Sequence, residues 1–133
     1  MVKQAFGVLF TAFVFLVMAS AISAQETTGN LEGTVQDPTG AVVPNISVTV
    51  TNSGSSGAST TGTGGGFRRT LTSNGDGFFR AVQIPPGSYD VVTAASSGFG
   101  VARYENVMVA IGKTTQLTVT VNPGGSAITV DVA

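Results

Sequence analysis

The sequence predicts an all-β protein, a single sandwich of two antiparallel sheets with about seven or eight short strands. Two observations lead to this fold class. After Gln25, apolar and polar residues alternate with a period of two in one segment after another, and no stretch carries an apolar stripe at the helical period of 3.6. Glycine, proline, asparagine and aspartate separate these segments at intervals of roughly 8–12 residues, which is typical of sandwich proteins.

Residues 1–24 have the layout of a secretory signal peptide. Lys3 supplies the positive charge, an apolar run extends from Ala5 to Met18, and small residues follow. The run is shorter than the ~20 residues that a membrane-spanning helix needs. We expect cleavage after Ala24, with Ala21 as the alternative site, and a mature chain that does not span a membrane. A retained N-terminal anchor is the rival interpretation of this segment.

The first half of the mature chain is predicted to contain two strands and a long loop. Residues 25–30 are expected to form a flexible N-terminus before the strand Leu31–Gln36, which ends in the turn sequence "DPTG". The clearest strand is Ile46–Thr51, where isoleucine and valine alternate with serine and threonine, so that one face meets a core. The segment 52–66 is rich in glycine, serine and threonine and carries too little bulk to offset its backbone entropy, so we expect a long flexible loop.

A hairpin is predicted in the middle of the chain. Its strands are Phe67–Ser73 and Phe78–Ile84, and the segment "NGDG" between them (Asn74–Gly77) is the strongest hairpin signal in the sequence.

A stiff corner follows this predicted hairpin. Pro85 and Pro86 have no N–H for a sheet ladder, so the preceding strand must stop. Gly87 tolerates a positive φ and permits a reversal of the chain. We interpret the corner as a rigid connection that can carry the chain from one sheet to the other, into the strand Ser88–Ala94.

The C-terminal part is predicted to add a second hairpin and a last strand. The strands Glu105–Ile111 and Thr114–Val121 flank a turn at Gly112-Lys113. Residues 122–133 are expected to form a connector that contains the short strand Ala127–Val132. The predicted core of the sandwich consists of Leu31, Val35, Ile46, Val48, Val50, Leu71, Phe78, Tyr89, Val91, Val107, Val109, Leu117, Val119 and Val121.

The composition argues against several classes of function. Without residues 1–24 the chain loses Lys3, which leaves five basic and seven acidic side chains, and this balance is unsuited to nucleic acid or anionic lipid. The sequence contains no cysteine and no histidine, and its carboxylates are scattered singly. General acid–base and metal chemistry mostly use those residue types or clustered carboxylates, so we expect no enzyme activity, no catalytic residue, no metal site and no cofactor.

A calcium loop at Asn74–Asp76 is a weak alternative to a plain turn. The position for a bidentate glutamate holds Gln83, so the calcium pattern is incomplete. We therefore interpret these residues as a turn.

Several motifs together resemble the carboxypeptidase regulatory-like domain. They are "GTVQDPTGAVVPN" (33–45), "DGFFRAVQIPPGSYDV" (76–91) and the Gly98-Phe99 pair, and the resemblance extends from Leu31 to Val121. It implies a transthyretin-like (prealbumin-like), Ig-like β-sandwich related to some carbohydrate-binding folds. Arg80 stands where the family often has an aromatic or apolar residue.

The order of the segments is similar to that of Oar-like TonB-dependent outer-membrane receptors. In those proteins a signal peptide is followed by this domain, a plug and a barrel. Up to Ala133 the chain has neither plug nor barrel, so we expect a stand-alone secreted module or the front part of a longer receptor. The resemblance implies the periplasm, the outer membrane or the exterior of a Gram-negative bacterium as its location. The implied partner is an envelope protein or the plug and barrel of a receptor.

We therefore predict a non-catalytic, secreted β-sandwich that acts as a structural or protein-interaction module of the cell envelope. The alternative is a carbohydrate-binding module, because sugars bind to exposed aromatic faces beside hydrogen-bonding groups. Phe67 and Tyr104 are the candidate ligand-binding residues for that alternative. Phe79 is a further aromatic residue that such a platform could use, and the chain has no tryptophan.

Overall fold

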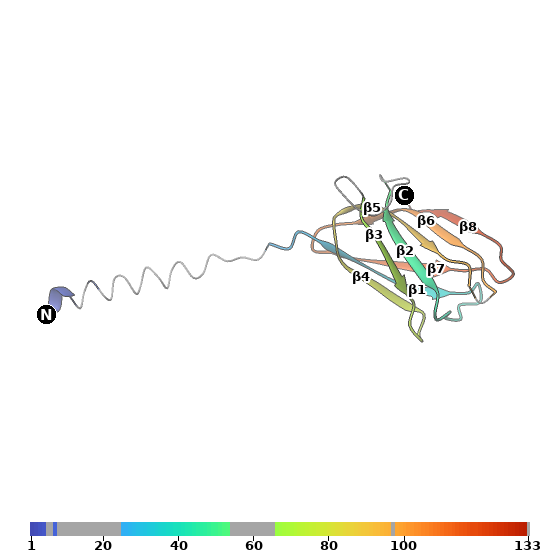
Figure 1. Ribbon diagram of the computed structural model, residues 1–133, viewed down its shortest axis with the longest axis horizontal. Coiled ribbons are helices and arrows are strands. Elements are labelled where there is room, and N and C mark those ends of the chain that lie inside the picture. Colours follow the sequence, from blue (N-terminus) through green and yellow to red (C-terminus); the bar gives the residue numbers. More distant parts are fainter. Residues whose placement is uncertain (5–6, 8–24, 54–65, 97, 133) are drawn as a thin grey trace.

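The computed structural model describes residues 1–4, 7, 25–53, 66–96 and 98–132 (Figure 1). Most of the predicted signal peptide, with its cleavage site, and most of the predicted loop 52–66 lie outside the described residues. Within the part that is described, no helix is long and apolar enough to span a membrane.

The described chain contains eight strands in two sheets, which confirms the predicted β-sandwich (Figure 1). The strands are β1 (Gly29–Gln36), β2 (Ser47–Asn52), β3 (Arg68–Thr72), β4 (Phe78–Ile84), β5 (Gly87–Thr93), β6 (Ala102–Val109), β7 (Thr114–Thr120) and β8 (Ile128–Asp131). One sheet has three strands in the order β4-β1-β7, and the other has five in the order β3-β2-β5-β6-β8.

Alternation along the strands builds the core between the sheets. In β2 the valines are fully buried while the threonines between them are not, as the period of two predicts. Eleven of the predicted core residues are buried, and Leu71 and Leu117 are partly buried against them. The buried eleven are Leu31, Val35, Ile46, Val48, Val50, Tyr89, Val91, Val107, Val109, Val119 and Val121.

The prediction for Phe78 was wrong, because its neighbour Phe79 occupies the core. Phe79 is 2% exposed, whereas Phe78 lies on the outer face and is 36% exposed. Gly33 of β1 pairs with Phe79 and provides the space for its ring. A Cβ atom on Gly33 would lie 2.4 Å from the Phe79 Cζ atom, closer than packed atoms approach. The missing side chain on β1 therefore explains which of the two rings points inward.

The two predicted hairpins are turns that carry the chain between the sheets. The Asn74 side chain accepts hydrogen bonds from the N–H groups of Asp76 and Phe78, both at 3.0 Å, so the turn itself forms as expected. However, β3 and β4 belong to different sheets and do not pair. The same holds for β6 and β7 around Gly112-Lys113. Turn residues reverse the chain locally, but the burial of the flanking side chains decides which strands pair.

The corner at Pro85–Gly87 carries the chain from the three-stranded to the five-stranded sheet, as interpreted from the sequence. Gly87 has a φ of 153°, a value that glycine adopts without strain. The Tyr89 hydroxyl donates a hydrogen bond of 2.7 Å to the Pro85 carbonyl. This bond ties the corner to the strand that follows.

Both sheets also contain a parallel pair that the local sequence did not predict. β1 pairs with β7 in parallel, as β6 does with β8, and the remaining pairs are antiparallel. β1 begins at Gly29, inside the segment expected to be flexible, and the N–H of Asn30 bonds to the Lys113 carbonyl. β6 begins at Ala102, three residues before the predicted strand.

Candidate functional site

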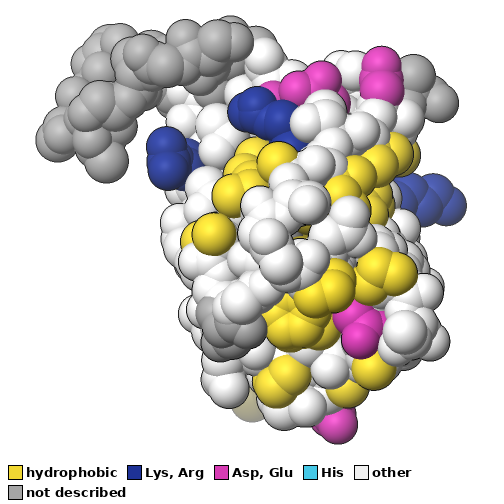
Figure 2. All heavy atoms as spheres, turned by 90° about the vertical axis from the view of Figure 1, so that its right-hand side faces the viewer, with side chains coloured by type: hydrophobic (Ala, Val, Ile, Leu, Met, Phe, Trp, Pro, Cys, Tyr) yellow, Lys and Arg dark blue, Asp and Glu magenta, His cyan; other side chains and the backbone are white. Residues whose placement is uncertain are grey.

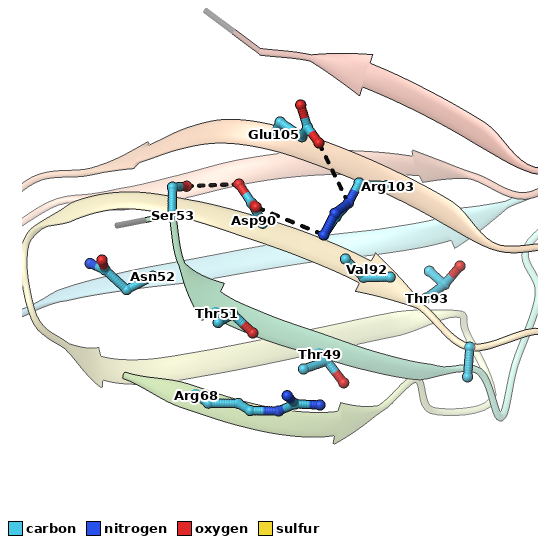
Figure 3. A pocket seen from close by; sticks show the side chains of 11 residues that line it. Thr49, Thr51, Asn52, Ser53, Arg68, Asp90, Val92, Thr93, Arg103 and Glu105 are labelled. Atoms are coloured by element: carbon cyan, nitrogen blue, oxygen red, sulfur yellow. Dashed lines mark hydrogen bonds and ion pairs between the residues drawn. The ribbon is translucent and has the colours of Figure 1, made fainter. Parts of the chain in front are cut away.

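The outer face of the five-stranded sheet is hollowed into an open cavity of about 720 Å³ (Figure 3). Strands β2, β3, β5 and β6 line it with hydroxyl, amide and charged side chains. The lining residues are Thr49, Thr51, Asn52, Ser53, Arg68, Asp90, Val92, Thr93, Ala94, Arg103 and Glu105.

Strand alternation brings these side chains to one face. In β5, Tyr89 and Val91 point into the core, so Asp90 and Val92 point outward. In β6, Ala102 and Tyr104 are buried in the same way, which leaves the polar residues between and after them on the outer face. The core therefore orients the lining of the cavity, although no lining carboxylate or guanidinium is itself in the core.

A chain of polar contacts crosses the cavity from β2 to β6 (Figure 3). The Ser53 hydroxyl donates a hydrogen bond of 2.7 Å to Asp90. The Arg103 guanidinium lies 4.0 Å from the other Asp90 oxygen and 3.5 Å from Glu105. Ion pairs this exposed contribute only ~0.2–1 kcal/mol each to stability. Their main effect is to hold the three charged groups in a defined arrangement.

The opposite border of the cavity is formed by Arg68 on β3, which is exposed (Figure 3). Among the described residues, no carboxylate lies within ion-pair distance of its guanidinium. The hydroxyl groups of Thr49 and Thr70 lie 3.1 Å apart beside it. As far as the described residues show, the cavity offers one cation without an ion-pair partner, two carboxylates around a second cation, and several hydroxyl groups.

This arrangement can hold a polar ligand by hydrogen bonds and charge pairs. Its charges of both signs balance, so it favours ligands that are neutral overall or that carry one anionic group toward Arg68. The described residues contain no cluster of three or more His, Cys, Asp or Glu side chains that could hold a metal ion. The proposed calcium ligand Asn74 uses its side-chain oxygen within its own turn.

Phe67 and Tyr104, the candidates from the sequence, are placed in the packing of the sandwich and do not line the cavity. The ring of Phe67 meets that of Tyr89 edge to face, with centroids 5.7 Å apart. Tyr104 is only 7% exposed, and its hydroxyl accepts a hydrogen bond of 2.9 Å from the Thr120 N–H. Phe79 is buried as well. Tyr104 and Phe79 are therefore buried, whereas Phe67 is only partly buried, with the Arg69 guanidinium 5.1 Å from the centre of its ring.

The charged lining residues were missed by the sequence-based search. Asp90 lies 13 residues before Arg103, and neither these two residues nor Glu105 match a motif. The available signal was the alternation of β5, which predicts that Asp90 points away from Tyr89 and Val91. Alternation along β6 places Arg103 and Glu105 on one face, and the pairing of β5 with β6 brings Asp90 beside Arg103.

Charged side chains are few on the end of the sandwich shown in Figure 2. Figure 2 shows one end of the sandwich, where hydrophobic side chains lie in several groups among polar atoms and charged side chains are few and separated. This distribution agrees with the low content of charged residues, 10% of the whole chain.

The two facing sheets define a transthyretin-like β-sandwich domain. Residues 30–122 match the carboxypeptidase regulatory-like domain family, and the chain belongs to that family. No curated protein sequence matches the chain.

Several solved structures share the fold. The chain is similar to the Bacillus anthracis TIE protein, with 18% identity, a TM-score of 0.55, and coverage of 73% of this chain and 17% of that one. It is also similar to GBS52, the minor pilin of the Gram-positive pathogen Streptococcus agalactiae, with 14% identity, a TM-score of 0.56, and coverage of 77% of this chain and 47% of that one. A third similar structure is that of a candidate carbohydrate-binding protein from Bacteroides uniformis, with 17% identity, a TM-score of 0.53, and coverage of 71% of this chain and 41% of that one. The chain therefore spans less than half the length of each of these proteins, and the likeness concerns the fold.

Proposed function

We propose that this protein is a non-catalytic interaction module of the cell envelope that works with a TonB-dependent outer-membrane receptor. The observation that carries the proposal is the open construction of the sandwich. Its sheets end in strand edges, and an exposed edge presents unpaired N–H and C=O groups to which another chain can add. Membership of the carboxypeptidase regulatory-like domain family is consistent with an accessory role beside a larger partner.

The residue inventory supports a role without catalysis. The sequence lacks histidine and cysteine, so its serines have no histidine to activate them as nucleophiles. The carboxylates of the outer cavity are tied to Arg103 and Ser53, an arrangement suited to binding.

The envelope location is supported by the order of the sequence segments. A segment with signal-peptide layout precedes the domain, and the closing sequence "SAITVDVA" follows it, an order that resembles the front part of Oar-like receptors. A module in that position has its free strand edges available to the receptor or to another envelope protein.

The proposal is tested in a Gram-negative host that produces the full chain. We expect mass spectrometry to find an N-terminus at Gln25 and fractionation to find the chain in the periplasm or with the outer membrane. Photo-crosslinkers placed on the two outer faces and along the free edges should form adducts with an envelope protein, a TonB-dependent receptor in particular. An uncleaved chain in the cytoplasm, or the absence of protein adducts from every position, would contradict the proposal.

A second candidate function, carbohydrate binding, is favoured by one observation, the polar cavity of about 720 Å³. Its hydroxyl and charged groups can bond a polyhydroxyl ligand without an aromatic platform. Titration with oligosaccharides should then shift the NMR signals of Asp90 and Arg103, and the Arg103→Ala variant should lose the effect. Shifts at Phe67 and Tyr104 alone, or none at all, would remove the cavity from consideration.

A further inference from the structure

The two sheets differ in width, and β8 extends beyond the smaller one (Figure 1). At one side of the sandwich β4 lies against β3, where the Arg69 guanidinium donates a hydrogen bond to the Val82 carbonyl. At the other side β7 lies against β6, where the Thr115 hydroxyl donates to the Met108 carbonyl at 2.7 Å. β8 pairs with the far side of β6 and forms the outermost strand of the five-stranded sheet. No described strand of the smaller sheet lies opposite it.

The side of β8 that faces the smaller sheet is apolar. In the parallel register Ala102 pairs with Ile128 and Tyr104 with Val130. Ala102 and Tyr104 point into the sandwich, so their partners point to the same side. Val132 follows by alternation, and its N–H bonds to the Glu105 carbonyl. We call Ile128, Val130 and Val132 the β8 strip.

The β8 strip remains uncovered. Val130 and Val132 are each 37% exposed, and Ile128 is half-buried. These side chains have the alternation and composition of a core-facing strand surface, yet water reaches them. An apolar strip beside an open strand edge is typical of a site where another strand packs.

The edge of β7 next to this strip has free backbone groups. The bonds from the Asn30 N–H to the Lys113 carbonyl and from the Val121 N–H to the Gln36 carbonyl fix the phase of the parallel ladder. Odd-numbered residues of β7 therefore bond to β1. The N–H and C=O groups of Thr114, Gln116, Thr118 and Thr120 point to the open side.

One end of this edge is already closed. The Tyr104 hydroxyl accepts a hydrogen bond from the Thr120 N–H, which blocks the last residue of β7. Three successive outward-facing residues, Thr114, Gln116 and Thr118, remain available, each with one N–H and one C=O. An extended polypeptide offers donors and acceptors that alternate at this spacing.

The edge of β4 is protected, in contrast to that of β7. The Val82 carbonyl bonds to Arg69, and the Phe78 carbonyl accepts a bond from the Asn74 N–H. A register shift opposite Gly29–Leu31, with Gln83 at a φ of 55°, distorts the end of β4. Such bulges and capping groups are common means by which proteins block edge strands.

The remaining edge strands are shorter than β7. β3 has five residues and β8 has four, whereas β7 has seven, "TTQLTVT", without proline, lysine or bulge. The edge of β7 is thus the longest unprotected edge among the described strands.

We propose that the β7 edge and the β8 strip together form a docking groove for an extended segment of a partner protein. This inference rests on the proposed function and names the surface through which it acts. The partner segment adds a fourth strand to the three-stranded sheet by bonding to Thr114, Gln116 and Thr118. Its alternate residues are apolar and cover Val130 and Val132, while the residues between them are polar and face water.

The groove selects an uncharged segment. Its side chains are threonine, glutamine, isoleucine and valine, and Asp131, the nearest acid on β8, points to the outer face and bonds to Asn106. Burial of a charged residue against the β8 strip would leave that charge unpaired. Because Coulomb attraction contributes little, added salt should change the affinity less than twofold.

Two pairs of matched variants test the groove in the full chain. Gln116→Pro removes an N–H from the open side of β7 and leaves the ladder to β1 intact, and Thr70→Pro makes the same change on the open side of β3. Val130→Asp places a charge on the β8 strip, and Thr129→Asp places it on the opposite face of the same strand. Circular dichroism checks that each variant is folded, and the two pairs provide independent tests if one variant does not fold.

The readout is photo-crosslinking in the Gram-negative host from a benzophenone amino acid at position 118. We expect an adduct whose partner segment, identified by mass spectrometry, alternates apolar and polar residues. The adduct should fall at least tenfold in Gln116→Pro and Val130→Asp and persist in Thr70→Pro and Thr129→Asp. Equal adduct in all four variants, a second copy of this chain as the captured species, or a helical or charged partner segment would overturn the inference.

The position of the crosslinker separates this inference from the proposed function. If a benzophenone at position 51, in the outer cavity, captures an envelope protein while position 118 captures none, the interaction module stands and the groove is wrong. If neither position nor any other captures a protein, both fail.

Discussion

The adjacent phenylalanines of β4 allow a direct test of the core. Phe79 is 2% exposed and Phe78 36% exposed, so the same substitution at the two positions should have very different effects. Phe79→Ala removes a fully buried ring and should cost ~3–5 kcal/mol of the free energy of unfolding. Gly33 opposite it has no side chain that could move into the cavity. Phe78→Ala loses mainly cross-strand contacts on the outer face and should cost about 1 kcal/mol.

Urea unfolding followed by far-ultraviolet circular dichroism measures both losses. With a urea dependence of about 1.5 kcal/mol per molar, a loss of ~4 kcal/mol lowers the midpoint by roughly 2.5 M, and a loss of about 1 kcal/mol lowers it by less than 1 M. If Phe79→Ala does not fold, Phe79→Leu should show a smaller shift in the same direction. Equal shifts, or a larger shift for Phe78→Ala, would refute the assignment of Phe79 to the core.

Three further predictions concern a turn, a buried hydroxyl and a glycine. The Thr39 hydroxyl and neighbouring backbone N–H groups hold the pKa of Asp37 below its usual value, so the stabilisation of this turn is lost as the pH falls through that lowered pKa, and Thr39→Val should raise the pKa in an NMR titration. Burial raises the pKa of Tyr89, so the stabilisation by the neutral Tyr89 side chain is present below about pH 10 and is lost as the pH rises through the higher pKa of the folded state. Tyr89→Phe should lower the free energy of unfolding by ~0.5–1.5 kcal/mol at neutral pH, and it should reduce the loss of stability at alkaline pH. Gly33→Ala should cost ~1–3 kcal/mol by thermal or urea unfolding, because its Cβ would overlap the Phe79 ring.

Each of these predictions has an outcome that would contradict it. An Asp37 pKa unchanged by Thr39→Val would show that the hydroxyl is not the main cause of the shift. Alkaline unfolding that is the same in wild type and Tyr89→Phe would mean that another group controls it. Gly33→Ala with wild-type stability would mean that the Phe79 ring lies elsewhere.

Local patterns in the sequence predicted the strands well. The alternation in the predicted strand Ile46–Thr51 identified Ile46, Val48 and Val50 as core residues, because a period of two leaves only one apolar face. The two adjacent phenylalanines of β4 satisfy either register, and alternation alone could not choose between them. The choice depends on Gly33, about fifty residues earlier, which the sequence does not connect to β4 until the strands pair.

Strand partners could not be predicted in the same way. Asn74–Gly77 and Gly112-Lys113 have sound turn chemistry, but each joins strands of different sheets. The parallel pairs β1–β7 and β6–β8 depend on contacts distant in sequence, for which turn residues carry no signal. The outer cavity escaped prediction for another reason: Asp90 and Arg103 meet through the pairing of the consecutive strands β5 and β6, and the predicted strand began at Glu105, after Arg103.

The position of β1 has a consequence for the order in which the protein folds. Leu31 pairs with Ala81 on one side and with Thr115 on the other, so the central strand of the smaller sheet closes loops of about 50 and about 84 residues. Contacts this distant in sequence form slowly, because the entropy of closing a large loop is lost before any strand-pairing hydrogen bond offsets it. During the proposed export, the first strand to cross the membrane waits for the seventh, and most of the domain must arrive before the hydrophobic interior can close.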